Sequence, residues 1–324
     1  MSLPEPYYDA GDVTIYHADA RTAHEWLPER SAHAIVTSPP YWGLRDYGED
    51  GQLGAEDDPQ TYIDGLADLL TGYGERVLRE DGSLWLNLGD TYAGSWGNYR
   101  ANGEDPRRDH LTQKHGTARR PSSRASVPNK CLVMIPERVA LALIDRGWIL
   151  RNKVVWAKPN GMPTSVQDRL ATKWEYVFHF VRHPRYYYDL DAIREEWKPR
   201  WVAQPGKWKG GIDGTAGPNS ITNRPPSREQ VERGANPGDW WVIPTQPYPG
   251  AHFAVYPPEL IRRPILATVP EGGTVLDPFF GSGTTGVMAR RLGRKTVGVE
   301  LSEDYCRLAA ERFREQVLDF GGAA

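Results

Sequence analysis

The sequence predicts an α/β protein built on a doubly wound, mostly parallel β-sheet with an inserted segment. Two observations indicate this fold. Short apolar runs with β-branched residues, such as residues 34–37 and 274–277, have the composition of strands buried on both faces. The second run is followed by a glycine-rich turn, a helical segment at 284–292 and a further strand at 295–300, as in a nucleotide-binding βαβ unit.

The first half of the chain alternates predicted strands with predicted helices. From Tyr62 to Leu78 apolar residues recur at helical spacing, so we expect a helix that ends at the Asp-Gly pair 81–82. We expect strands at residues 12–18, 33–37, 83–88, 148–157, 174–182 and 186–190, with the last two forming a hairpin around 183–184. We expect further helices at residues 20–30, from Pro136 to Gly147, from Pro257 to Ala267 with a kink at Pro264, and after a cap at Ser302.

Two long segments are irregular and basic. Residues 92–130 are rich in Gly, Ser, Asn and Arg, and a loop of that length is functional or disordered. Residues 196–250 interleave Pro, Gly and basic residues with five tryptophans, which are too apolar to remain in water. We therefore interpret 196–250 as an inserted recognition segment, between a catalytic half at 1–195 and a second half of the same domain at 251–324.

The composition fits one large domain with an insertion, or two small domains, because 39% of the 324 residues are hydrophobic. A net charge of −3 gives no global signal for nucleic-acid binding, so any such signal must be local. There is no run of roughly eighteen apolar residues and no leader sequence, which predicts a soluble, cytoplasmic protein without a membrane partner. The two cysteines, Cys131 and Cys306, cannot by themselves form a disulfide framework or a metal site, in agreement with a reducing compartment.

The strand at 34–37 stops at Ser38-Pro39-Pro40-Tyr41. Neither proline has an N–H and each fixes its φ, so the chain can continue neither a ladder nor a helix. In the stiff turn that results, the Ser38 hydroxyl and the Pro39 carbonyl can accept protons from a planar amine while the Tyr41 ring stacks on it. Taken alone, the turn is equally consistent with a proline-rich strand exit that packs a tyrosine.

The second motif is the turn at residues 277–285, DPFFGSGTT. Its glycines let the backbone approach a ligand closely, and the helix that follows offers free N–H groups. Glu300, about twenty residues further on at the end of a strand, is placed to accept hydrogen bonds from ribose hydroxyls. The turn lacks the lysine of a phosphate-binding loop and the third glycine of a dinucleotide fingerprint, which favours a nucleoside ligand without phosphates.

Together, the motifs at 38–41 and 277–285 resemble those of DNA methyltransferases that act on amino groups and use S-adenosyl-L-methionine (SAM). Their order, with the catalytic motif first and the recognition region between the two, is similar to the permuted beta class of that family. The resemblance implies a Rossmann-like SAM-methyltransferase sheet that is circularly permuted, because joining the termini would restore the ordinary doubly wound order. Further segments that resemble the family are 82–90, 148–160, 174–189 and 252–265.

The resemblance also implies a role for each residue of the two motifs. The catalytic residues would be Ser38, Pro39, Pro40 and Tyr41. For the cofactor, the family pattern places Asp277 and Phe279 near the methionine and adenine parts of SAM, Gly281 and Gly283 in the turn, Thr284 and Thr285 near the SAM carboxylate, and Glu300 at the ribose. Asp19 is a candidate for contacting the adenine amine, although a solvated turn aspartate would have the same pattern. No metal is expected.

The amine of cytosine or adenine is a poor nucleophile because its lone pair is delocalised into the ring. Acceptors at Ser38 and Pro39 favour a pyramidal amine, whose freed lone pair attacks the sulfonium methyl in line. A paired base is out of reach, so the expected partner is double-stranded DNA with the target base flipped out and stacked on Tyr41. The basic segments 100–130 and 194–233 would contact phosphates and the recognition site.

Serine at position 38 favours the N4 amine of cytosine, because the family's adenine enzymes mostly carry Asp there; N6 of adenine is the first alternative. RNA or protein methylation is a second, although those relatives tend to carry Asn at this position. Attack at cytosine C5 needs a thiolate, and neither Cys131 nor Cys306 follows a proline in a turn. A nucleic-acid-binding pseudoenzyme is the alternative from another class. The sequence leaves open the recognised site, a homodimer and a cognate restriction enzyme as partners.

Overall fold

The computed structural model describes residues 3–43, 52–93, 127–161, 164, 166–197, 228–246 and 256–320. The chain divides into two compact units: the larger comprises Met1–Tyr188 with Asp239–Ala324, and the smaller is Asp189–Gly238. None of the helices in the described ranges has the length and apolar composition needed to cross a membrane.

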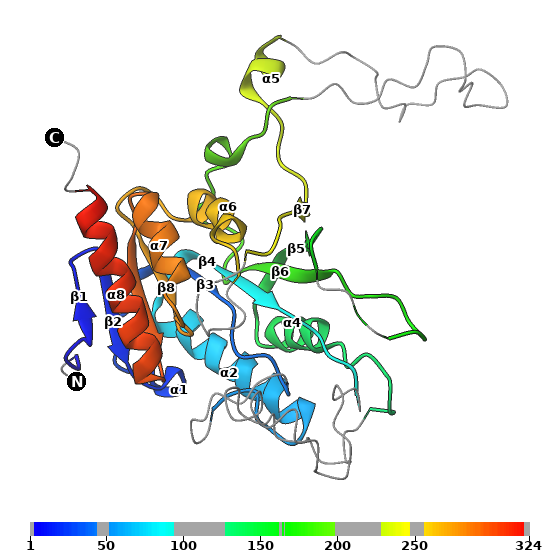
Figure 1. The fold of residues 1–324 in the computed structure, drawn as a ribbon. Helices are drawn as coiled ribbons and strands as arrows, with labels where there is room; N and C mark the ends of the chain where they lie inside the picture. The colour runs from blue at the N-terminus through cyan, green and yellow to red at the C-terminus, as the bar shows by residue number, and fades with distance from the viewer. Residues whose placement is uncertain are drawn as a thin grey trace. The chain divides into compact units, whose positions relative to one another are not determined.

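The larger unit is organised around a sheet that has nine strands within the described residues, in the order β1-β2-β9-β8-β3-β4-β6-β5-β7 (Figure 1). The strands are β1 Tyr8–Asp9, β2 Val13–His17, β3 Ala32–Thr37, β4 Leu78–Leu88, β5 Ile149–Ala157, β6 Trp174–Val181, β7 Trp240–Val242, β8 Thr274–Asp277 and β9 Lys295–Glu300. The central run β2-β9-β8-β3-β4 is parallel throughout, whereas β6 runs antiparallel to both β4 and β5. The predicted mostly parallel α/β sheet is therefore confirmed.

The two ends of the chain contribute neighbouring elements. β2 pairs in parallel with β9, with His17 opposite Glu300. β1 and the helix α8, Glu303–Phe320, lie side by side (Figure 1), and the rings of Tyr8 and Phe313 are 6.3 Å apart. Pairing of β2 with β9 is required by the predicted permuted order, which itself stays a prediction.

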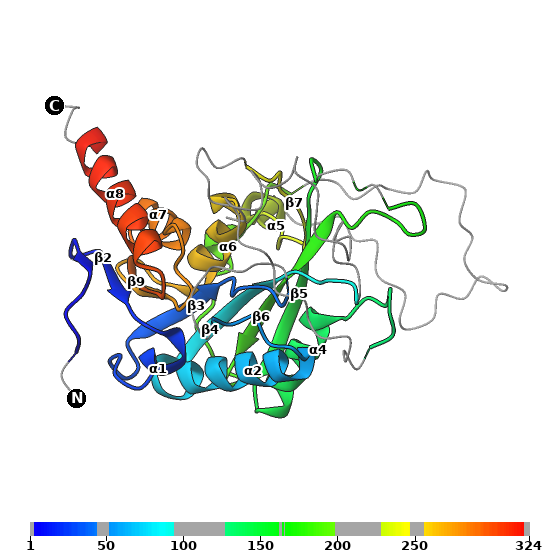
Figure 2. The ribbon, with the colours of Figure 1, turned by 60° about the horizontal axis from the view of Figure 1, so that its bottom comes forward.

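Helices cover both faces of the sheet (Figure 2). One face packs against α1 Ala20–Ala23, α2 Pro59–Arg76 and α4 Ile135–Asp145, and the other against α6 Pro258–Thr268, α7 Thr284–Arg291 and α8. β3 lies between the two layers: Ile35 belongs to the core under α2, and Ala34 and Val36 to the core under α6. Burial on both faces is what the uniformly apolar run at 34–37 predicts.

The boundary between α2 and β4 differs from the prediction. α2 ends at Arg76 and β4 begins at Leu78, so the Asp-Gly pair 81–82 lies inside the strand instead of ending the helix. The pairing of β3 with β4 shifts register there, from Ala32 opposite Leu78 to Ala34 opposite Ser83. The extra residues of β4 form a β-bulge. Asp81 and Gly82 therefore have the irregular backbone that these residue types favour, although the strand is not interrupted by a turn.

The predicted strand at 186–190 and its hairpin are wrong. Residues 186–189 form no strand, and both edges of β6 are already paired, with β4 on one side and β5 on the other. The rings of Tyr186 and Tyr188 instead pack on buried His179 of β6, at centroid distances of 5.8 and 5.9 Å. Three successive tyrosines have strand propensity, but here the aromatic packing decides their conformation.

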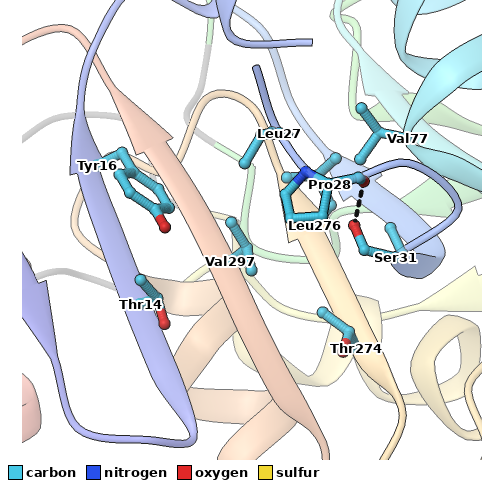
Figure 3. Close-up of a pocket in the computed structure, with 10 residues that line it drawn as sticks. Thr14, Tyr16, Leu27, Pro28, Ser31, Val77, Thr274, Leu276 and Val297 are labelled. Atoms are coloured by element: carbon cyan, nitrogen blue, oxygen red, sulfur yellow. Dashed lines mark hydrogen bonds between the residues drawn. The ribbon is translucent and has the colours of Figure 1, made fainter. Parts of the chain in front are cut away.

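The predicted helix at 20–30 is also shorter than expected, because α1 ends at Ala23. Pro28 has no N–H and disfavours helical backbone at the residue before it, which explains why the helix does not continue. The segment that follows this short helix helps to line a cavity of about 140 Å³, together with residues of β2, β8 and β9 (Figure 3). It is lined by Thr14, Tyr16, Leu27, Pro28, Ser31, Ala32, Val77, Thr274, Leu276 and Val297.

The smaller unit contains a one-turn 3-10 helix, Asp191–Ile193, and the short helix α5, Arg228–Arg233. An isolated bridge joins Glu195 to Ala235, and the Arg194 guanidinium donates to the Gly234 carbonyl at 3.2 Å. Most of the predicted basic loop at 92–130, and much of the predicted recognition segment at 196–250, lie outside the described residues. The proposed boundaries of these segments stay predictions.

Candidate active site

The two turns that carry the sequence motifs meet at one edge of the sheet. β3 and β8 are adjacent and parallel, with Ala34 opposite Val275. Because the carboxyl ends of parallel strands lie at the same edge, the turn at 38–41 after β3 lies beside the turn at 277–283 after β8. The structure therefore brings both predicted motifs into one site.

Asp277 joins the ends of these two strands. Asp277 is 2% exposed, and its carboxylate accepts hydrogen bonds from Thr37 Oγ1 at 2.6 Å, Thr285 Oγ1 at 2.5 Å and the Phe279 amide at 3.1 Å. The Tyr256 hydroxyl lies 2.5 Å from Thr285 Oγ1. Burial raises the pKa of Asp277 to about 7, although these hydrogen bonds favour its charged form. Because Thr37 is the last residue of β3, the carboxylate ties the end of β3 to the turn after β8.

The glycine-rich turn has the backbone that its sequence requires. Gly281 and Gly283 adopt φ values of +51° and +79°, which side chains disfavour. At Gly283 a Cβ would also lie 3.0 Å from the Phe313 ring. α7 begins directly afterwards, at Thr284. The turn thus combines a close backbone approach with the start of a helix, and residues 277–285 contain no basic side chain.

Glu300 lies beside this turn. It ends β9, and its two carboxylate oxygens accept hydrogen bonds from the Gly281 amide at 2.7 Å and the Ser302 amide at 2.9 Å. Burial raises the pKa of Glu300, while the amide hydrogen bonds act in the opposite direction. A carboxylate has about four lone-pair positions, more than these amides occupy, so it can still accept from hydroxyls of a ligand.

Asp19 follows β2 on the same edge of the sheet. Its carboxylate caps α1 by accepting from the Arg21 amide at 2.8 Å, and it forms an ion pair with the Arg21 guanidinium at 2.5 Å. Partial burial alone would raise the pKa of Asp19, but the hydrogen bonds and charge of Arg21 lower it. The structure therefore gives Asp19 a local role as a helix cap, and contact with a cofactor stays a prediction.

The Ser38 hydroxyl belongs to a hydrogen-bonded network that extends from the turn to residues of β4 and β6. Ser38 Oγ lies 3.4 Å from both the Tyr41 hydroxyl and Asn87 Oδ1. The Tyr41 hydroxyl in turn lies 3.1 Å from Asn87 Oδ1 and 3.0 Å from Glu175 Oε2. Asn87 Nδ2 donates to Glu175 Oε2 at 3.3 Å and to the Tyr176 carbonyl at 3.0 Å, which fixes the direction of the amide.

The rest of the turn is held by α2 and by the core. The Tyr62 hydroxyl of α2 donates to the Pro40 carbonyl at 2.9 Å. Trp42 is 2% exposed and its indole N–H donates to the Glu56 carbonyl at 2.8 Å, so Trp42 is a core residue. Among the described residues, no backbone N–H donates to the Pro39 carbonyl.

The Tyr41 ring packs against the backbone of Gly89. A side chain at Gly89 would place its Cβ 2.4 Å from Tyr41 Cε2, so only glycine leaves room for the ring. Burial, together with the nearby Glu175 carboxylate, raises the pKa of the Tyr41 hydroxyl well above its ordinary value. The hydroxyl is therefore a proton donor directed into the sheet, while stacking of its ring on a base stays a prediction.

Sequence reasoning missed three residues of this network. They are Asn87, which is 4% exposed, and the ion pair of Glu175 with Lys158, whose side chains are each 18% exposed. A signal was present: Asn87 interrupts the apolar run at 83–88, and Glu175 stands near the start of the apolar strand at 174–181. A buried polar residue in such a run requires a partner, which points to a network.

Comparison with known proteins identifies the family of the chain. The sequence profile of a DNA methylase family, which covers N6 and N4 methyltransferases, matches residues 32–311. The chain belongs to this family. It is 40% identical to the Type II methyltransferase M.SmaI of Serratia marcescens over 298 residues, covering 92% of this chain and 89% of that one. Against the Type II methyltransferase M.Cfr9I of Citrobacter freundii the identity is 39%, with coverages of 93% and 88%.

Solved structures share the fold. The cytosine-N4-specific PvuII DNA methyltransferase superimposes with a TM-score of 0.61 at 19% identity, covering 97% of this chain and 93% of that one. A DNA modification methylase of Thermus thermophilus, solved in complex with SAM, superimposes with a TM-score of 0.53 at 25% identity, with coverages of 94% and 95%. The chain is therefore a DNA methyltransferase of the N4/N6 amino type, and SAM is its cofactor.

The residues of the turn fit that cofactor. SAM carries a nucleoside with two ribose hydroxyls and no phosphate. The site offers the Glu300 carboxylate for hydroxyls and positive-φ glycines for close approach, and residues 277–285 contain no lysine or arginine that would bind a phosphate. Arg312 of α8 reaches the turn, but its guanidinium donates to the Ser282 carbonyl at 3.0 Å and to Thr284 Oγ1 at 3.3 Å. This donor set suits a nucleoside better than a nucleotide.

Proposed function

We propose that the chain transfers a methyl group from SAM to the N4 amine of cytosine in double-stranded DNA. The observation that carries this proposal is the hydrogen bonding of Ser38. Its proton has acceptors inside the protein, in the Tyr41 hydroxyl and Asn87 Oδ1, so its oxygen lone pairs are available to a substrate amine. A neutral hydroxyl accepts an N–H without burying a charge. The family's adenine enzymes usually place a carboxylate at this position, which favours cytosine here.

In this mechanism the catalytic turn prepares the amine. Ser38 Oγ and the Pro39 carbonyl accept its two protons, which favours a pyramidal nitrogen with a localised lone pair. Bound SAM supplies the electrophilic methyl group on its sulfonium. The turn is stiff and anchored by Tyr62, so the acceptors are already in place when the base arrives. Tyr41 supports the turn through its hydroxyl and offers its ring to the flipped base.

The cofactor turn would bind SAM through residues of three strand ends. Glu300 at the end of β9 accepts from the ribose, and the backbone at Gly281 and Gly283 allows close approach. The remaining predicted contacts are Asp277 and Phe279 near the methionine and adenine parts, Thr284 and Thr285 near the carboxylate, and Asp19 near the adenine amine. Because Asp277 is buried and accepts from Thr37 and Thr285, we expect it to act by holding the turn in shape.

A paired cytosine cannot reach a turn at the edge of a sheet, so the target nucleotide must be flipped out of the duplex. The basic segments 100–130 and 194–233 are the proposed contacts to phosphates and to the recognised sequence. The relatives from Serratia marcescens and Citrobacter freundii are Type II methyltransferases, which supports a cognate restriction enzyme as a partner of this chain.

The test is to identify the methylated base. Purified protein is incubated with SAM and unmethylated genomic DNA, the DNA is digested to nucleosides, and the products are separated by mass spectrometry. We expect N4-methylcytosine. Finding N6-methyladenine would overturn the assignment of the base, and finding no methylated nucleoside with any DNA substrate would favour the pseudoenzyme. Ser38→Ala protein, tested in parallel, controls for contaminating methyltransferases.

A further inference from the structure

Glu175 is a partly buried acid near the catalytic turn, and the proposed chemistry does not use it directly. It lies on β6, two strands away from β3, where Trp156 of β5 is its neighbour in the ladder. One oxygen, Oε2, accepts from the Tyr41 hydroxyl at 3.0 Å and from Asn87 Nδ2 at 3.3 Å. The other, Oε1, accepts from the Lys158 ammonium, so the carboxylate is satisfied on both sides.

Lys158 is itself held in place. Its side chain is 18% exposed, and its ammonium lies 4.2 Å from the centroid of the Trp156 ring, an attractive cation–π geometry. Its backbone amide donates to the Lys173 carbonyl at 2.8 Å. A positive charge fixed beside Glu175 balances the carboxylate in a mostly buried place, where an unpaired charge would be costly.

Glu175 determines which groups donate and which accept in the hydrogen bonds of this network. A carboxylate can only accept, so the Tyr41 proton goes to Glu175 and the Asn87 amide turns its Nδ2 toward it. Asn87 Oδ1 and the Tyr41 oxygen then remain as acceptors for the Ser38 proton. As a result, Ser38 donates inward and keeps its lone pairs for the substrate amine.

We propose that Glu175, held by Lys158, is a positioning residue that fixes the direction of the hydrogen bonds around Ser38 and so keeps the Ser38 oxygen free to accept from the amine. Without the carboxylate, the acceptors that remain for the Tyr41 hydroxyl within the described part of the chain are Asn87 Oδ1 and Ser38 Oγ. Donation to Ser38 occupies a lone pair that the amine needs, and donation to Asn87 competes with the Ser38 proton. This inference rests on the proposed role of Ser38.

The test compares methyl transfer in a single turnover, with enzyme in excess over DNA and saturating SAM. Glu175→Gln keeps the size of the side chain but can donate toward Tyr41. We expect the rate to fall about tenfold, as one misdirected hydrogen bond would give, while the SAM dissociation constant from calorimetry changes less than about twofold. An unchanged rate would overturn the proposal.

A matched control removes a similar ion pair whose carboxylate, as far as the described residues show, has no hydrogen bond to Ser38, Tyr41, Asn87 or Glu175, although its lysine lies 3.7 Å from the centroid of the Tyr176 ring. Glu137 of α4 pairs with Lys153 of β5 at 2.9 Å, with side chains 24% and 36% exposed. Glu137→Gln should leave the transfer rate unchanged. A rate loss equal to that of Glu175→Gln would show that removing any Lys–Glu pair around β5 disturbs the sheet, which contradicts a specific role for Glu175.

A double-mutant cycle separates positioning from a merely structural contribution. In Tyr41→Phe protein the hydroxyl through which Glu175 acts is gone, so a further Glu175→Gln change should cost less than about threefold. Full additivity of the two losses would contradict the proposal. Ser38→Ala tests the underlying function separately, because an unchanged methyl-transfer rate in this variant would contradict the proposed role of Ser38. If Ser38→Ala lowers the transfer rate but Glu175→Gln does not, only the inference about Glu175 is wrong.

Discussion

Replacing Asp277 by asparagine should remove a pH-dependent part of the stability of the fold. In the folded chain burial raises the pKa of this carboxyl from 3.8 to about 7. Below about pH 4 the group is protonated in both the folded and the unfolded chain, so it causes no difference. As the pH rises from 4 to 7 the unfolded chain ionises first, and the folded chain loses stability through this group.

The size of the effect follows from the two pKa values. Each pKa unit corresponds to about 1.4 kcal/mol, so between pH 5 and pH 8 the wild-type chain should lose about 2–3 kcal/mol of unfolding free energy through Asp277. Asparagine is neutral at every pH and can still accept from Thr37 Oγ1. The unfolding free energy of Asp277→Asn relative to wild type should therefore increase by that amount between pH 5 and pH 8.

The assay is urea unfolding without SAM at pH 5, 6, 7 and 8, for the wild type and for Asp277→Asn. Asp145→Asn, on the exposed end of α4, is the matched control and should follow the pH dependence of the wild type. Equal pH dependence in the wild type and Asp277→Asn would refute the reasoning. It would mean that the hydroxyls of Thr37 and Thr285 stabilise the ionised carboxylate enough to offset its burial.

Three further substitutions test other parts of the site. Glu300→Ala should weaken SAM binding in calorimetry and leave DNA affinity unchanged, because it removes the acceptor beside the glycine turn; equal loss of both would indicate unfolding. Gly89→Ala places a Cβ 2.4 Å from the Tyr41 ring and should slow methyl transfer at least about tenfold, whereas Gly65→Ala, which meets nothing within 4 Å, should retain full activity. Replacing residues 200–235 with a Gly/Ser linker should abolish the sequence preference seen on sequencing methylated DNA while SAM still binds, and a retained preference would place specificity elsewhere.

The parts of the fold nearest the cofactor turn were predictable from local sequence. The strands at 274–277 and 295–300 have the predicted bounds, because short apolar runs between glycine-containing turns fit few structures other than buried strands. The errors have a different origin. The tyrosines at 186–188 have the local sequence of a strand, but β6 has no free edge with which they could pair. The sequence around these tyrosines does not show that β4 and β5 already occupy both edges of β6.

The candidate site also has some residues that local sequence predicts and others that only the pairing of distant strands reveals. Ser38 and Glu300 are recognisable because Ser38 directly follows a strand, Glu300 ends one, and residues that constrain the backbone lie next to them. Asn87 and Glu175 are 88 residues apart and meet only because β4 pairs with β6. A polar residue in an apolar strand signals that it has a partner, but only the register of the sheet identifies which one.

The most direct test of the account is the effect of Ser38→Ala on a single turnover of methyl transfer from labelled SAM to DNA. One lost acceptor is worth about 1–3 kcal/mol, so the rate should fall about ten- to a hundredfold while the SAM dissociation constant stays the same. A rate equal to that of the wild type would contradict the account, because Ser38 would then only shape the turn, and the amine would find its acceptors elsewhere.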